Sequence, residues 1–317
     1  MVGLAGCASG HADKASTGAN SVTDSAGTAA EAPPLYGFWG LNGFVSPSGL
    51  NDLKLRLGLT TFETATSDPH WGVTGLLPMA KSAGLHVGLR LTDDHEAYTT
   101  AAGDFDLAAW KAQVAPWGGS GVQAYIDDGT LVGHMLLDDV VNFEGRDPDA
   151  ADFEEMARYS KELMPGLMTF VRQKASALPI PEGGRYVYLD ANVNQYEHME
   201  GMVEYYAANE AETARRLGLG VINGLNIADG GDGSAGRPGY RAQHHPMTAA
   251  EITAYGTVLA KVPACGMFLN WEYDDQELWS DGSIGAEYFR EPELQAALLS
   301  LGKLVAKHPH VTLLKPH

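Results

Sequence analysis

Basic residues and long apolar runs are scarce in this sequence. Lys and Arg together number 21 against 40 Asp and Glu, which gives a formal net charge of -19 at pH 7. Nucleic acid is therefore not the expected partner, because a phosphate backbone is bound by clustered Lys and Arg, and anionic lipid is disfavoured for the same reason. No apolar run reaches the roughly 18 residues that a membrane-spanning helix requires. A neutral substrate fits this charge best.

Cysteine is equally scarce, and its two occurrences lie in different settings. Cys265 lies in the apolar run ACGMFL, and we expect it to be a small buried side chain. Cys7 ends the segment LAGC, in which small residues preceded by Leu come directly before the cysteine. This segment resembles the lipobox of bacterial lipoproteins, and the resemblance implies that Cys7 is diacylated and becomes the first mature residue.

The segment around Cys7 is followed by a long stretch of small residues. Only six residues precede Cys7, whereas an export signal needs a basic stretch and a longer apolar core, so we expect residues 1–7 to be a truncated signal with its lipobox. Residues 8–34 are dominated by Ala, Ser, Gly and Thr and end in APP, a composition that predicts a flexible tether. Together these segments predict an exported protein, anchored at the periplasmic or extracellular face of a bacterial envelope only through a lipid on Cys7.

The remainder of the chain has the composition of a folded domain. Hydrophobic residues make up 44% of the sequence and charged residues 19%, as in ordinary globular proteins. The length of 317 residues allows one large domain or two average ones, and α/β barrels of this size commonly form one. We therefore expect a single domain over residues 35–317, acting as a monomer.

From residue 35 onward, strand-like segments alternate with helical ones. The helical segments include 150–177, 197–217, 248–261 and 292–307, and the third opens with Thr248 and Glu251 at capping-box spacing. This alternation predicts a parallel sheet with helices outside. The strand-like segments are 35–42, 59–65, 85–92, 130–138, 185–192, 219–227 and 265–272.

Two closures are consistent with this alternation, a (β/α)8 barrel of TIM type and a doubly wound open sheet. A doubly wound dinucleotide fold would show a Gly-rich phosphate loop after the first strand, and this chain has none. The segment 310–314 could supply an eighth strand. We therefore predict an α/β fold of the (β/α)8 type.

Active sites of such barrels lie at the C-terminal ends of the strands, where this sequence places many polar residues. Because side chains alternate between faces, polar members of the strands should point inward, although inward polar networks can also serve only to shape a core. The expected inward sets are His86, Gly88, Arg90 and Thr92; Tyr186, Tyr188, Asp190 and Asn192; and Gly266, Phe268, Asn270 and Glu272.

The predicted fourth strand ends in two adjacent carboxylates. The apolar run 131–137 is followed directly by Asp138 and Asp139. Two such charges at the end of a buried strand are costly unless they are paired, bound to a metal or catalytic. Alternation leaves open which one points inward, because Met135 shares a face with Asp139 and His134 with Asp138. We favour Asp139.

The predicted seventh strand ends in the segment NWEYDD, which places Glu272 between Trp271 and Tyr273. A carboxylate flanked by aromatic residues suits sugar chemistry, because aromatic rings stack on the apolar face of a pyranose while carboxylates bind its hydroxyl groups. Trp39 at the first strand could add a further stacking surface, whereas Trp279 is expected to pack in the core. The predicted substrate-binding residues are Trp39, Glu63, Arg90, Asp190, Asn192, Asn226, Trp271 and Tyr273.

An acid at the end of strand four and a second at the end of strand seven resemble the retaining glycoside hydrolases of (β/α)8 type. The resemblance covers the architecture from about residue 35 onward. It implies that Asp138 or Asp139 donates a proton and that Glu272 is the nucleophile. That family usually shows Asn-Glu at strand four, where this chain shows two aspartates, so the catalytic assignment does not follow from a shared local motif.

Other reaction classes have weaker signals. The chain lacks the Gly-x-Ser-x-Gly elbow, and the loop DGGDGS at 229–234 lacks the terminal acid of an EF-hand. The segments DDHE at 93–96 and HH at 244–245 contain metal-ligand types without a recognised spacing. We predict a glycoside hydrolase that acts on an extracellular poly- or oligosaccharide without a metal or other cofactor. A non-catalytic glycan-binding lipoprotein and a metal-dependent hydrolase or deacetylase remain as alternatives.

Lipidation can be tested directly. The protein produced in a bacterial host with a complete export signal should carry a diacylglyceryl group on Cys7, because the residues before it match a lipobox. Mass spectrometry of the mature N-terminus measures this, and a Cys7→Ala variant should lack the added mass and leave the membrane fraction. An unmodified Cys7 thiol in membrane-bound protein would contradict the prediction.

Overall fold

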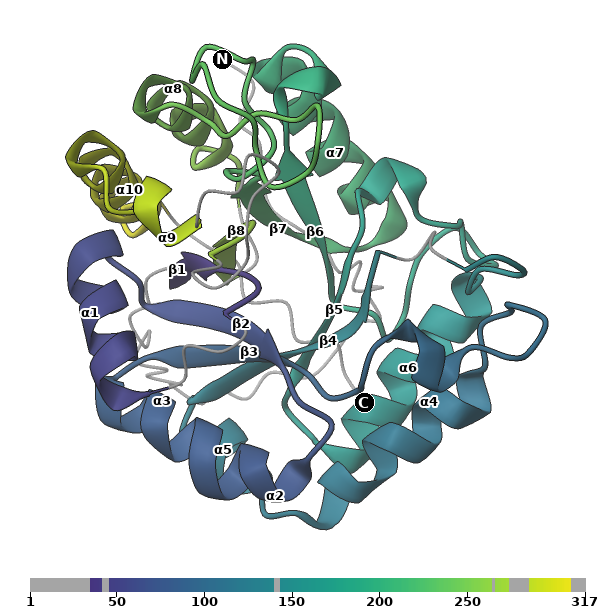
Figure 1. Cartoon of the computed structure of the whole chain (residues 1–317). Helices are drawn as coiled ribbons and strands as arrows, with labels where there is room; N and C mark the ends of the chain where they lie inside the picture. Colours follow the sequence, from purple (N-terminus) through teal and green to yellow (C-terminus); the bar gives the residue numbers. More distant parts are fainter. Residues whose placement is uncertain (1–34, 42–45, 140–142, 264–265, 274–284, 309–317) are drawn as a thin grey trace, which may run out of the picture.

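The eight strands of this chain close into a parallel barrel. The computed structural model describes residues 35–41, 46–139, 143–263, 266–273 and 285–308. Within these ranges each strand is hydrogen-bonded to the next in sequence order, and β1 and β8 pair to complete the ring (Figure 1). The predicted α/β fold of (β/α)8 type is therefore confirmed. Cys7, the segment 8–34, Cys265, Trp279 and the segment 310–314 lie outside the described residues.

The strands are short and all parallel, and the register shifts where β4 pairs with β3 and with β5. Closure leaves no free sheet edge, so the backbone hydrogen bonds of each strand are satisfied by its two neighbours. The strands are β1 Leu35–Phe38, β2 Thr61–Ala65, β3 His86–Arg90, β4 Leu131–Asp138, β5 Met168–Arg172, β6 Ala191–Tyr196, β7 Gly220–Leu225 and β8 Met267–Asn270.

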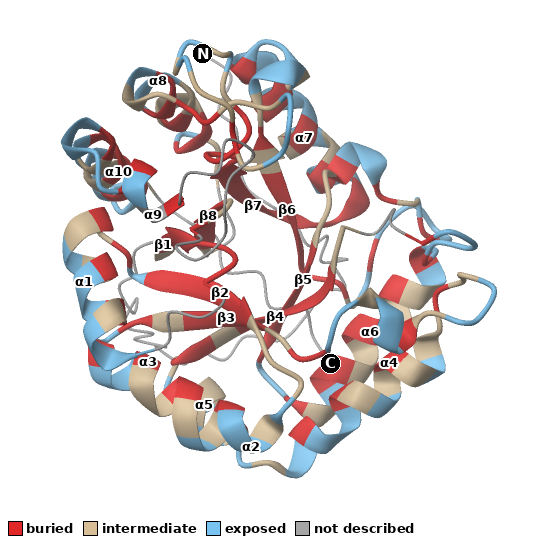
Figure 2. Cartoon of the chain, viewed as in Figure 1, coloured by how far each residue is buried: buried red, intermediate tan, exposed pale blue. Residues whose placement is uncertain are grey.

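Helices surround the strands and bury their apolar faces against them (Figure 2). The capping box predicted at Thr248 and Glu251 is confirmed, and a second one at Asp149 and Asp152 opens α6. None of the helices in the described ranges is both long and apolar enough to cross a membrane. The helices are α1 Pro47–Leu57, α2 Pro69–Trp71, α3 Leu77–Ala83, α4 Leu107–Val114, α5 Gln123–Asp127, α6 Ala150–Leu163, α7 Val203–Leu217, α8 Ala249–Leu259, α9 Gly285–Tyr288 and α10 Pro292–Val305.

The predicted helix over 150–177 is wrong in its second half. Helix α6 ends at Leu163, and Pro165 and Gly166 separate it from β5, whose sequence MTFVR contains strand-forming residues. The predicted fifth strand, 185–192, corresponds mainly to the approach to β6. The predicted sixth and seventh strands are therefore β7 and β8, and the barrel closes on eight strands without residues 310–314.

The barrel interior is apolar, which reverses the predicted faces of two strands. Ala191 and Val193 of β6 and Met267 and Leu269 of β8 belong to the interior cluster, whereas Phe268 packs among the outer helices. The alternation of polar residues predicted the opposite faces for these two strands. It failed because both faces of a barrel strand are buried, so polar residues do not mark the interior face. The interior cluster consists of Trp39, Met135, Met168, Phe170, Ala191, Val193, Ile222, Met267 and Leu269.

A buried ion pair joins α6 to the start of β6. The Lys161 ammonium lies 2.8 Å from Oδ2 of Asp190, and their side chains are 2% and 0% exposed. The Thr169 backbone N–H donates to the same carboxylate at 2.8 Å. Asp190 therefore precedes its strand, at the end of the barrel opposite the mouth, and its predicted role in binding substrate is wrong.

Removing the cation of this pair tests its contribution to stability. Lys161→Met should lower the free energy of unfolding by about 3–5 kcal/mol, because Asp190 would keep a buried charge without its partner. Urea unfolding followed by circular dichroism measures the change. Arg215→Met removes one member of the exposed pair with Glu212 and should have no measurable effect. Equal effects of the two substitutions would contradict the assignment.

Candidate active site

A cavity of about 270 Å³ lies at the C-terminal ends of the strands. Residues from the ends of β1, β2, β3, β4, β5 and β8 line it, which is where barrel enzymes carry out their chemistry. Carboxylates, arginines and tryptophans dominate its surface. The lining residues are Trp39, Gly40, Glu63, Ala65, Arg90, Asp94, Met135, Asp138, Arg172, Tyr240, Trp271 and Glu272.

The structure brings about half of the predicted site residues to this cavity and leaves the others outside it. Those that line it are Trp39, Glu63, Arg90, Asp138, Trp271 and Glu272. Those that do not line it are Asp139, Asp190, Asn192, Asn226 and Tyr273.

A register shift in β4 decides which aspartate points into the cavity. The pairing of β4 with β5 is interrupted between Met135 and Asp138. Leu136 and Leu137 consequently both pack among the outer helices, and Asp138 returns to the interior face that Met135 occupies. Asp139 has a left-handed backbone with φ 46° and a side chain 46% exposed. Our preference for Asp139 as the inward acid is therefore wrong.

Two arginines compensate the charge of Asp138. Arg172 Nε donates to Asp138 Oδ1, and Arg90 Nη1 lies 3.8 Å from Asp138 Oδ2. Arg172 also reaches Asp139 with its Nη2, at 2.5 Å, and its guanidinium lies 3.8 Å above the ring centroid of Trp39. Burial raises the pKa of Asp138, and the two guanidinium groups oppose this shift.

Arg172 was missed in the sequence analysis because β5 was assigned to a helix. The signal was present in the sequence, since the helix-ending pair Pro165 and Gly166 comes shortly before the strand-forming segment MTFVR. Arg172 is the last residue of that strand, so it lies at the barrel mouth beside the end of β4.

Glu63 is the most deeply buried acid of the cavity, with 2% of its surface exposed. Burial raises the pKa of Glu63 well above its ordinary value, and the nearby charge of Asp138 raises it further. Arg90, Arg172 and a hydrogen bond from the Gly40 backbone act in the opposite direction and only partly offset burial. No hydrogen-bond partner in the described residues contacts Glu63 Oε1. Burial therefore favours the protonated form of Glu63 in the free protein.

Gly40 brings Glu63 and Glu272 to the same corner of the cavity. Its backbone N–H lies near the Glu63 carboxyl and lowers the pKa of that group, and a Cβ placed on Gly40 would lie 2.6 Å from Glu272 Oε2. The φ of Gly40 is 77°, a conformation that glycine adopts without steric cost. No other residue could fill this position without moving the Glu272 carboxylate.

The predicted aromatic residues differ in how far they are buried, and arginines lie over the rings of both tryptophans. Trp39 is 6% exposed and Arg172 covers its ring. Trp271 is half-buried, with the Tyr240 ring edge-on to it at 5.6 Å. Tyr273 is 3% exposed and packs against Phe289, with ring centroids 4.9 Å apart, so its predicted role in binding substrate is wrong.

The two predicted asparagines also have structural partners instead of facing the cavity. Asn192 is fully buried and donates to the Gln173 carbonyl at 2.9 Å. Asn226 donates to Glu197 and accepts from the Asp229 backbone N–H, so it holds the loop after β7. Their predicted roles as ligands for sugar hydroxyls are therefore wrong.

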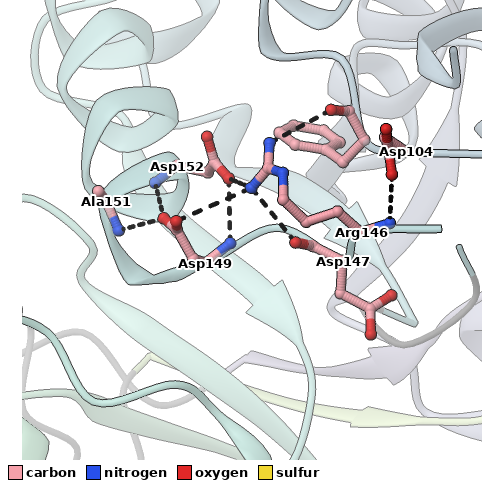
Figure 3. Close-up of polar contacts among 7 residues, drawn as sticks. Asp104, Arg146, Asp147, Asp149, Ala151 and Asp152 are labelled. Carbon is pink, nitrogen blue, oxygen red and sulfur yellow. Dashed lines mark hydrogen bonds and ion pairs between the residues drawn. The ribbon is translucent and has the colours of Figure 1, made fainter.

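Arg146 ties the loop after β3 to the loop after β4 (Figure 3). Its backbone N–H donates to Asp104 Oδ1 at 2.6 Å, and its carbonyl accepts from the Phe105 N–H at 2.9 Å. Its Nη1 donates to Asp152 Oδ2 at 2.6 Å, at the first turn of α6. These bonds link the two loops that follow the strands carrying Arg90 and Asp138.

A second cavity, of about 480 Å³, adjoins the first over the ends of β2 and β3. The two share Ala65, Arg90 and Asp94. Thr92 and Glu96 add further polar groups to the second cavity. Within the described ranges, no three His, Cys, Asp or Glu side chains are grouped closely enough to hold a metal ion.

Several solved structures share this architecture. The clostridial cellulose synthase subunit Z (CcsZ) from Clostridioides difficile is 13% identical, with a TM-score of 0.51 over 84% of this chain and 99% of that chain. A GH5_18 from Bifidobacterium longum subsp. infantis is 10% identical, with a TM-score of 0.55 over 88% and 80%. The β-glucanase SdGluc5_26A from Saccharophagus degradans is 12% identical, with a TM-score of 0.53 over 87% and 89%.

These likenesses concern the fold. They confirm the predicted resemblance in architecture to the (β/α)8 glycoside hydrolases. No protein-family model matches the sequence, and no curated relative does. Identities of 10–13% carry no residue roles from those proteins to this chain.

The raised pKa of Glu63 predicts a pH-dependent cost in stability. In the unfolded chain Glu63 ionises near its ordinary pKa of 4.5, whereas the folded protein retains the proton to higher pH. The contribution of Glu63 to the free energy of unfolding is therefore fully present below pH 4.5. It is lost as pH rises from there toward the folded-state pKa of Glu63. Glu63→Gln, which cannot ionise, should gain stability relative to the native protein as pH rises from acidic to neutral. Urea unfolding across that range measures it, and a pH-independent difference would contradict the shift.

Proposed function

We propose that this chain is a glycoside hydrolase that acts on a poly- or oligosaccharide with the carboxyl groups at its barrel mouth. One observation carries the proposal: Glu63, Asp138 and Glu272, from the ends of three different strands, line a single cavity together with Trp271. Glycosidic bonds are hydrolysed by a pair of carboxyl groups, of which one is protonated and the other ionised. The shared architecture with glycan-processing proteins supports the same class of substrate.

Glu272 is proposed as the ionised member of the pair. It follows Trp271, a half-buried residue that lines the cavity, and it would attack the anomeric carbon or activate water there. Its place after β8 differs from that of the strand-seven nucleophile implied by the resemblance. Asn226 is the residue that follows β7. The assignment therefore depends on the geometry of this cavity.

The adjoining cavity favours a substrate longer than one sugar. It continues from the carboxyl groups over Arg90 and Asp94 and offers hydroxyl and carboxylate groups for further sugar residues. With the lipid anchor proposed at Cys7, such an enzyme would act on glycans at the cell envelope.

A non-catalytic glycan-binding barrel is the second candidate. Two observations favour this candidate. The acid at the end of β4, Asp138, is ion-paired with arginines, and the residue after β7 is an amide where the resemblance implies an acid. Measurement of hydrolysis and of binding on the same glycans separates the two candidates.

The first test is the replacement of the proposed nucleophile. Glu272→Gln should lower turnover of any polysaccharide that the native protein cleaves by about 10³-fold or more while preserving binding, because the amide keeps the volume but loses the charge that acts in the transition state. Reducing-end release and calorimetric binding on a panel of polysaccharides measure both. Glu212→Gln, exposed on α7, is the matched control and should leave turnover unchanged.

Two outcomes would contradict the proposal in different ways. If Glu272→Gln retains native turnover, Glu272 is not the nucleophile. If several glycans bind and none is cleaved by the native protein, the non-catalytic candidate is correct.

A further inference from the structure

The proposed hydrolysis needs a proton donor, and the cavity contains two buried acids that could serve, Asp138 and Glu63. A donor must hold a proton at working pH and deliver it to the leaving oxygen. The two acids differ in the cations around them and in how their oxygens are bonded.

Asp138 is held by guanidinium groups on both of its oxygens. Arg172 Nε donates to Oδ1, and Arg90 Nη1 lies 3.8 Å from Oδ2. A hydrogen bond from a cation stabilises the ionised form of a carboxyl group, and the N–H group that Arg172 donates to Oδ1 occupies a position where a proton would sit. Asp138 is therefore placed to orient Arg172 and Arg90 and is poorly placed to donate a proton.

Glu63 lies in the opposite situation. Its side chain is almost fully buried, yet Oε1 has no hydrogen-bond partner in the described residues. A protonated carboxyl group has one O–H donor, and here no acceptor in that part of the chain competes for it. Gly88 on β3 leaves room beside it, since a Cβ there would lie 3.5 Å from Glu63 Cγ.

Glu63 also lies next to the proposed nucleophile. The Gly40 backbone N–H lies near the Glu63 carboxyl and favours its ionised form, and a Cβ placed on Gly40 would lie 2.6 Å from Glu272 Oε2. The two carboxyl groups therefore flank one backbone position and face the same cavity.

We infer that Glu63, at the end of β2, is the acid that protonates the leaving group in the proposed hydrolysis. This inference rests on the proposed function. As the bond between the anomeric carbon and the glycosidic oxygen breaks, its electron pair stays on that oxygen, which takes the proton of Glu63. The carboxylate of Glu272, or a water molecule that it deprotonates, forms the new bond to the anomeric carbon. Glu63 is left ionised and recovers a proton from water.

The charges facing Glu63 determine the pH range in which it keeps its proton. Arg90 on β3 and Arg172 on β5 favour ionisation, whereas Asp138 on β4 and the burial of the carboxyl favour the protonated form. Glu272 and Asp94 line the same cavity and add negative charge to it. Because the pKa of Glu63 is raised well above its ordinary value, activity should fall only at a pH above that value, as Glu63 ionises.

The test compares Glu63→Gln with Asp138→Asn on two substrates that share one sugar. The first is the oligosaccharide that the native protein cleaves, and the second is a dinitrophenyl glycoside of the same sugar, whose leaving group needs no proton. Glu63→Gln should lower kcat/KM on the oligosaccharide by about 10²–10⁴-fold and on the aryl glycoside by less than about tenfold. The fall of kcat/KM at high pH should also disappear in Glu63→Gln on the aryl glycoside.

Three other results would overturn the inference, and each would do so for a different reason. If Asp138→Asn shows the leaving-group dependence and Glu63→Gln does not, Asp138 is the donor and the proposed function stands. If Glu63→Gln slows both substrates equally, with binding and thermal unfolding retained, Glu63 only positions other groups. If the native protein cleaves neither substrate, the proposed function fails together with the inference.

Discussion

Closure of the eight strands is the constraint on which the rest of this structure depends. Each strand is covered by helices on one face and packed inside the ring on the other, so both faces are buried. Charged side chains within the barrel must then be paired, as Lys161 and Asp190 are, or be placed at the strand ends where the cavity opens. The cavity acids lie together because the strand ends are where an incompletely paired charge is tolerated.

The same constraint explains how far the sequence could predict the molecule. Alternation of strands and helices predicted the barrel, and the position of polar residues at strand ends predicted Glu63, Arg90 and Glu272 in one cavity. Face assignments from polar alternation failed for β6 and β8, because alternation identifies an interior face only where the other face meets solvent. The choice of Asp138 over Asp139 depends on a register shift between β4 and β5, which is a relation between two strands and leaves no periodic signal in either.

Charge compensation within the cavity separates its acids into two kinds. Asp138 lies against Arg172 and Arg90, and removal of either arginine would leave a buried charge uncompensated. Arg172 also covers Trp39, so the arginine that holds the acid removes one stacking surface from the mouth. Glu63 has no such cation bonded to Oε1, and neutralisation by a proton is the remaining way to bury it. A cavity that contains an ion-paired acid beside an acid whose protonated form is favoured by burial has the asymmetry that acid-assisted bond cleavage requires.

The positions of these acids show why architecture alone could not assign them. Structures that share the barrel at 10–13% identity establish where a mouth lies, and every strand end around that mouth can carry a catalytic group. In this chain the end of β7 is occupied by an amide that holds its own loop, and the end of β4 is bound by arginine. The acid of β2 and the acid that follows β8 lie instead near Gly40, which comes two residues after the strand between them in the closed ring. Because closure makes β8 and β2 the two neighbours of β1, residues separated by about two thirds of the chain become one site, and a glycine between them allows both carboxyl groups to approach.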